Sequence, residues 1–172
     1  MNETVLRRLL EGEAVISLAF LPDDVIGVSG QIFINATPEN VWRALTDYDN
    51  LSKNLPKVVS SRVVERHGNE IILDQTGKTG IFIFERIVHF RLKLCEEYLK
   101  RIIFEQVEGD LSIYRGSWVL ETPPEVSGTV LSYVAEIKPD FFAPPLLVSF
   151  VQRQDLPQIL KAHKQRAESL QK

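Results

Sequence analysis

Residues 31–48 read QIFINATPENVWRALTDY, and within this stretch a strand pattern changes to a helix pattern. Ile32 and Ile34 lie on one side of the alternation, which is typical of a strand with one buried face. Thr37 is a suitable helix N-cap and Pro38 suits the first helical position. The apolar residues that follow at helical spacing are Val41, Trp42, Ala44 and Leu45. The stretch therefore predicts a strand followed directly by a short helix.

On the C-terminal side, a second short helix is expected from Tyr48 to Asn54, before Pro56. From Val58 to Lys138 the chain reads as strands separated by turn signals, among them Gly77-Lys78-Thr79-Gly80. The expected strands are Val58–Arg66, Glu70–Gln75, Ile81–Leu94, Leu99–Val107, Ile113–Thr122 and Thr129–Lys138. Connections this short make neighbouring strands antiparallel. With Val25–Asn35, the sequence predicts seven antiparallel strands.

Beyond Pro139, apolar residues recur at helical spacing and predict a long helix from Pro145 to Leu170, kinked near Pro157. The sequence thus predicts an α+β fold, with one domain over residues 25–172. A chain of 172 residues suits a single domain. Residues 1–24 form an N-terminal extension whose segment Ala14–Phe20 is too apolar for a solvated loop.

Composition excludes several classes of function. Twenty basic and 23 acidic residues give a net charge of -3, which argues against a nucleic-acid-binding domain. A single cysteine cannot form an internal disulfide, and the three histidines lack metal-ligand spacing. We therefore expect no metal and no cofactor. Neither a membrane-spanning run nor a signal peptide is visible, so a cytoplasmic location is expected.

Arg86 is the one charged residue on an apolar strand face. Arg86 shares this face with Phe82, Phe84, Val88 and Phe90, which lie at alternate positions of the strand. A buried guanidinium requires either a protein carboxylate or a polar group of a ligand, and pairing within the protein is the commoner arrangement. The strand carboxylates are expected on the outer face of a half-exposed sheet. No catalytic residue is predicted.

Several motifs along residues 30–168 resemble one branch of a known superfamily. The motifs are Ile34–Trp42 with Leu45–Tyr48, Leu55-Pro56 before Ser61–Val63, Glu108–Asp110 leading to Gly116–Leu120, Leu131–Tyr133, and Arg153–Pro157. They resemble the coenzyme Q-binding and polyketide cyclase/dehydrase branch of the START-like (SRPBCC) superfamily. The resemblance implies a helix-grip fold, in which a curved antiparallel sheet wraps round the C-terminal helix. The predicted order of strands and helices agrees with it.

The resemblance also implies a cavity between sheet and helix that holds a hydrophobic small molecule such as a lipid, quinone or polyketide. The residues expected to bind this ligand are Phe82, Phe84, Arg86, Val88, Phe90, Ile102, Phe104, Trp118, Leu120, Leu131, Tyr133, Leu147, Phe150 and Val151. Binding without catalysis is favoured, because no cluster of polar residues beyond Arg86 marks an enzyme.

Two other functions stay open. An interaction module acting through a macromolecular partner such as the ribosome would use Lys161, Lys164, Arg166 and Lys172. A polyketide cyclase or dehydratase would use Arg86 with a cavity tyrosine. The segment from Pro139 to Val151 is expected to gate the cavity and to touch membranes transiently, through Phe141, Phe142, Leu146 and Leu147. The alternative is that Phe141 and Phe142 fold inward as a hydrophobic plug.

Overall fold

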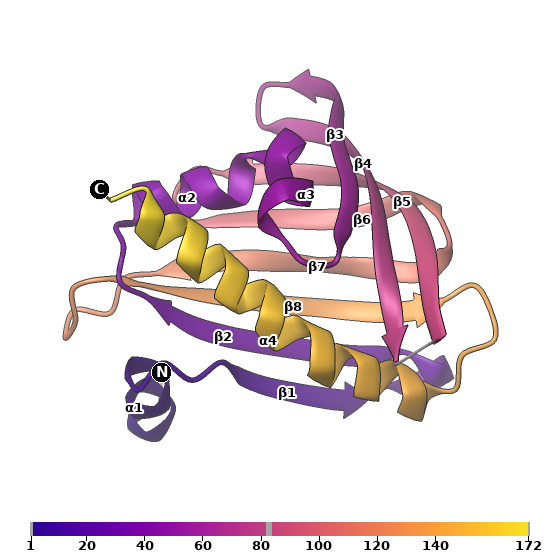
Figure 1. Ribbon diagram of the computed structural model, residues 1–172, viewed down its shortest axis with the longest axis horizontal. Helices are drawn as coiled ribbons and strands as arrows, with labels where there is room; N and C mark the ends of the chain where they lie inside the picture. The colour runs from indigo at the N-terminus through magenta and orange to yellow at the C-terminus, as the bar shows by residue number, and fades with distance from the viewer. Residues whose placement is uncertain (1, 82–83, 172) are drawn as a thin grey trace.

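A single antiparallel sheet and one long helix dominate the computed structural model, which describes residues 2–81 and 84–171 (Figure 1). Eight strands are arranged in the order β1-β2-β8-β7-β6-β5-β4-β3. The strands are β1 (Val15–Phe20), β2 (Ile26–Ile34), β3 (Val58–His67), β4 (Glu70–Ile81), β5 (Phe84–Glu97), β6 (Arg101–Gly109), β7 (Leu111–Glu121) and β8 (Thr129–Pro139). The expected α+β helix-grip architecture is confirmed.

The helices gather mainly on one face of this sheet. They are α1 (Glu3–Leu10), α2 (Pro38–Thr46), α3 (Leu51–Asn54) and α4 (Pro145–Ser169), with the 3-10 turns η1 (Pro22–Asp24) and η2 (Tyr48–Asn50). Figure 1 shows α4 crossing the sheet, with α2 and α3 beside its C-terminal half. The helix continues through Pro157.

The prediction of seven strands is wrong by one, because Val15–Phe20 forms an additional edge strand. This segment, β1, pairs antiparallel with β2, from Val15 opposite Gln31 to Phe20 opposite Ile26. A short apolar run cannot be assigned as strand or helix from periodicity alone, and its partner lies beyond a turn. Part of the N-terminal extension therefore lengthens the sheet.

The predicted turn at residues 77–80 is also wrong, since β4 continues to Ile81. The backbone of Lys57 approaches this strand, and the Lys78 N–H donates to the Lys57 carbonyl over 3.0 Å. A Cβ on Gly77 would lie 3.4 Å from the same carbonyl oxygen. Gly77 thus marks a close approach of two backbones, which in sequence looks like a turn signal.

The short helix α2 forms as its sequence predicts. The side chain of Thr37 accepts a hydrogen bond from the Asn40 N–H at 3.4 Å, and Pro38 occupies the first turn. Val41 and Ala44 are buried. Because a helix this short is not stable alone, burial of this face against α4 and β8 holds it in place.

Glycine at position 30 allows α4 to lie close to β2. A Cβ there would come within 2.8 Å of the Leu156 side chain and 2.9 Å of Leu160. Both leucines are buried in the hydrophobic core. This contact fixes one side of α4 on the sheet.

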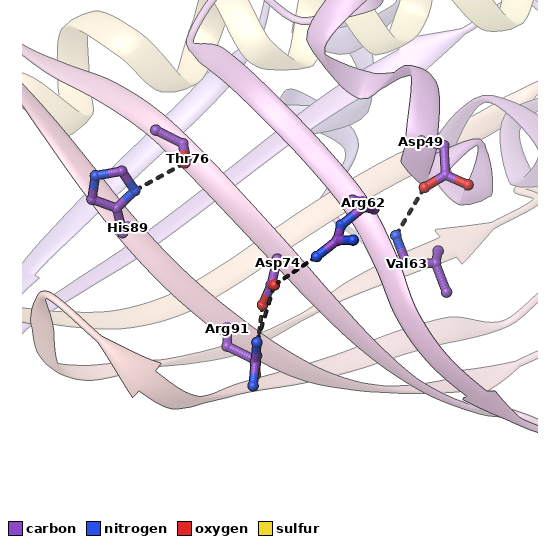
Figure 2. Close-up of polar contacts among 7 residues, drawn as sticks. All are labelled: Asp49, Arg62, Val63, Asp74, Thr76, His89 and Arg91. Carbon is purple, nitrogen blue, oxygen red and sulfur yellow. Dashed lines mark hydrogen bonds and ion pairs between the residues drawn. The ribbon is translucent and has the colours of Figure 1, made fainter.

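The outer face of β3, β4 and β5 carries a polar network, shown in Figure 2. Asp74 accepts a 2.6 Å hydrogen bond from Arg91 on β5 and lies 3.6 Å from Arg62 on β3. The neighbouring cross-strand pair is Thr76 and His89, with 3.0 Å between their side-chain atoms. His89 is thus a structural residue of this face, and the alternate residues of β4 point to the opposite side.

Candidate functional site

A cavity of about 710 Å³ lies between the sheet and α4. The helix contributes lining residues from Leu147 to His163, which corresponds to about 24 Å of helix length. Nine of the predicted ligand-binding residues line it, namely Arg86, Val88, Phe90, Ile102, Phe104, Trp118, Tyr133, Leu147 and Val151.

Three predicted residues do not reach the cavity. Leu120 and Leu131 face each other across β7 and β8, two positions beyond Trp118 and Tyr133, and are buried in the hydrophobic core. Phe150 is 53% exposed, because a step of one residue along α4 turns it away from the side that Val151 occupies. Phe82 and the side chain of Phe84 lie outside the described residues.

The prediction that Arg86 is buried is wrong. The side chain is exposed, and its guanidinium carbon lies 3.7 Å from the ring centroid of Phe141. Residue 86 is close to the start of β5, so the long side chain can reach the rim of the cavity. A cation–π contact with Phe141 takes the place of the expected carboxylate.

Aromatic side chains of three strands form the inner wall of the cavity. The Phe104 ring lies 5.0 Å from Tyr114 and 6.0 Å from Tyr133, and Trp118 lies 4.6 Å from Tyr133. The hydroxyls of Tyr114 and Tyr133 are 3.4 Å apart. Burial raises the pKa of both phenols, so they remain neutral hydrogen-bonding groups.

His163 lies at the far end of the helix lining, and the sequence analysis missed it as a cavity residue. Its ring is buried and meets the Trp118 ring edge-on, with centroids 5.0 Å apart. Burial lowers the pKa of His163 to about 4, which makes the imidazole neutral at pH 7. A usable signal existed, because residue 163 is seven positions after Leu156 and shares its helix face.

Asp155 and Lys57 form a buried polar pair in the same wall. The Lys57 Nζ lies 3.5 Å from Asp155 Oδ1, and their side chains are 20% and 8% exposed. Burial raises the pKa of Asp155, and the lysine opposes that effect. In sequence, Asp155 stood out only as part of a family motif, although it lies four residues after Val151 on the buried side of α4.

The contributions of η2, α3 and β4 to the cavity could not be predicted from the sequence. Tyr48, Leu51, Leu55, Leu73 and Gln75 line the cavity. The two short helices have too few apolar residues to show which side faces a cavity. Leu73 and Gln75 were assigned to a strand without a choice of face.

Exposed apolar side chains surround one end of the cavity. Phe142 is 95% exposed, Leu146 73% and Leu147 46%. Phe141 is only partly exposed, beneath Arg86. Phe141 and Phe142 therefore differ in environment, since Phe141 packs at the rim of the cavity while Phe142 points to solvent.

Two classes of site are not found in the described part of the chain. Within residues 2–81 and 84–171, no group of three or more histidine, cysteine, aspartate or glutamate side chains could hold a metal ion. The described helices include none that is both long and apolar enough to cross a membrane.

The sheet, the gripped helix and the cavity between them define a START-like helix-grip protein. Residues 34–164 match the family model described as polyketide cyclase / dehydrase and lipid transport, and the chain belongs to this family.

Solved structures share the fold. A protein from Thermus thermophilus is 24% identical with a TM-score of 0.73, and the alignment covers 85% of this chain and 99% of that one. The Zhui aromatase/cyclase from Streptomyces sp. R1128 is 14% identical with a TM-score of 0.74, covering 86% and 96%. A STAR-related lipid transfer protein from Xanthomonas axonopodis is 15% identical with a TM-score of 0.63, covering 88% and 98%. No curated protein matches the sequence.

Proposed function

We propose that this protein binds a hydrophobic small molecule, such as a lipid, quinone or polyketide-like compound, in the cavity beneath α4. The cavity carries the proposal. Its volume of about 710 Å³ falls in the range of roughly 300–1,000 Å³ that is typical of ligand pockets. Most of its lining residues are apolar or aromatic, and a minority are polar, among them Lys57, Gln75 and Asp155, which is the usual make-up of such sites.

Binding without catalysis fits the polar groups better than an enzyme does. An acid–base mechanism needs two groups whose protonation states can change near neutral pH, within hydrogen-bond reach of one substrate. Arg86 is exposed at the rim and stacked on Phe141, and the tyrosine hydroxyls remain protonated. Burial keeps His163 neutral, and Asp155 is held by Lys57. The family description includes cyclases and lipid transport proteins, so it is compatible with either role.

The ion pairs of α4 argue against the alternative of a ribosome-binding module. Lys164 lies 2.6 Å from Glu168, and Arg166 lies 3.7 Å from Asp47. Neutralised cations contribute less to an electrostatic footprint on RNA. Lys172 lies outside the described residues.

Native mass spectrometry of protein purified without organic solvent tests the proposal. We expect a population with an added mass that organic extraction removes, or uptake of such a mass after incubation with a total lipid extract. Protein that neither carries nor takes up an apolar compound would contradict it.

A further inference from the structure

Asp155 has an unused hydrogen-bonding atom inside the cavity. Its Oδ1 is buried and has no hydrogen bond of normal geometry from any residue that the structure describes, although Lys57 and Thr79 lie close enough to lower the pKa of the carboxyl. At 3.5 Å, Lys57 is close enough to compensate the charge, although the pair does not form a hydrogen bond. A buried acceptor without a partner costs free energy, so a partner supplied by a ligand would be stabilising.

The residues around Asp155 show that its carboxylate lies in the wall of the cavity. Asp155, Lys57, Thr79 and Gln152 all line the cavity. The remaining helix residues of the lining nearby are apolar, among them Val151 and Leu156. The pair is thus a small polar spot in a mainly apolar wall.

The charges decide which group fits. The carboxylate and the ammonium cancel, and Glu85 and Arg86 of the lining are exposed to solvent. An additional ion of either sign buried beside the pair would therefore lack a buried counter-charge. A hydroxyl is neutral, donates one hydrogen bond and accepts others. It could donate to Asp155 Oδ1 while its oxygen accepts from Lys57 Nζ.

We propose that Asp155 and Lys57 form a subsite for the hydroxyl group of an otherwise apolar ligand. This inference rests on the proposed function, since it assumes that a ligand occupies the cavity. It narrows the ligand class to hydrophobic alcohols or phenols, whose apolar body lies along the aromatic wall.

Two fluorescent probes test it, 1-pyrenebutanol and its methyl ether, in which a methyl group replaces the donor hydrogen. The wild-type protein should bind the alcohol about tenfold more tightly than the ether, at the lower end of what a hydrogen bond to a charged group contributes. Asp155→Leu should bring that ratio close to one, with the affinity for the ether undiminished.

Control variants separate the change in the binding ratio from a general loss of structure. Removing one partner of a buried ion pair is destabilising, so circular dichroism checks that Asp155→Leu folds, and Asp155→Asn provides a second variant that retains the shape. Glu121→Leu, which removes an exposed carboxylate of β7, should keep the wild-type ratio.

The outcomes distinguish failure of the hydroxyl subsite from failure of the proposed ligand-binding function. Equal binding of both probes by the wild type, or an unchanged ratio in folded Asp155→Leu, would overturn the hydroxyl subsite and leave the cavity function standing. Binding of neither probe by the wild type would overturn both.

Discussion

At the scale of single residues, α4 brings two polar side chains into a mainly apolar cavity, and burial shifts their pKa values in opposite directions. His163 is buried and stays neutral, with a pKa lowered to about 4 by burial. Asp155 is buried beside a lysine, and its pKa is raised by burial. Both residues are more costly to bury in their charged forms than in their neutral forms.

His163 should make the fold sensitive to mild acid. Its pKa in the folded state lies below the value of 6.5 for a free histidine, so the unfolded chain binds a proton more readily. The stability due to this residue is complete above pH 6.5 and declines as pH falls toward 4. Between pH 7 and pH 5 we expect a loss of about 2 kcal/mol.

Urea unfolding of wild type and His163→Leu at the two pH values measures that loss. The stability difference between the proteins should shift by about 2 kcal/mol in favour of the variant at pH 5. Because Asp155 acts in both proteins, its opposite contribution cancels in the comparison. His67→Leu, at a side chain that is 80% exposed, is the matched control. An identical pH dependence in wild type and His163→Leu would contradict the assignment.

At the scale of elements, the connection from β8 to α4 and the first turn of α4 expose large apolar side chains. Phe142 and Leu146 are 95% and 73% exposed. Pro139 ends β8, and Pro144 and Pro145 stand at the start of α4, so prolines bound the connection on both sides. Clustered exposed apolar side chains often mark interaction sites, and here they adjoin the cavity. We therefore propose that this segment docks on lipid and gates the cavity.

Phe142→Ser with Leu146→Ser should slow transfer of a pyrene-labelled lipid between vesicles several-fold. The melting temperature should change little, because exposed substitutions usually alter stability by no more than about 0.5 kcal/mol. Val64→Ser with Val107→Ser removes exposed apolar area from β3 and β6 and should leave transfer unaffected. A large fall in melting temperature would assign Phe142 and Leu146 to the core, and an unchanged rate would refute the docking surface.

At the scale of the whole molecule, the fold was predictable because its signals are local. Thr37 and Pro38 begin a helix, and the alternation within β5 and β8 marks strands without knowledge of their partners. β1 was missed because its assignment depends on pairing with β2, a contact that a short apolar run does not encode.

The cavity wall was only partly predictable, since it depends on where space is left between elements. Trp118 and Leu120 share a strand face, yet the first lines the cavity and the second fills the core. Arg86 follows the same alternation and emerges at the rim. Asp155 and His163 look like ordinary polar residues of a helix until α4 is seen against the sheet.

Blocking the cavity tests the central claim most directly, and α4 offers two adjacent positions for it. Val151 lines the cavity, whereas Phe150 is turned away and 53% exposed. A titration with the neutral fluorescent probe N-phenyl-1-naphthylamine should show saturable binding to the wild type and to Phe150→Trp. Val151→Trp, folded by circular dichroism, should bind at least tenfold more weakly because the indole occupies the ligand's space. Undiminished binding by Val151→Trp, or no binding by the wild type, would contradict the account.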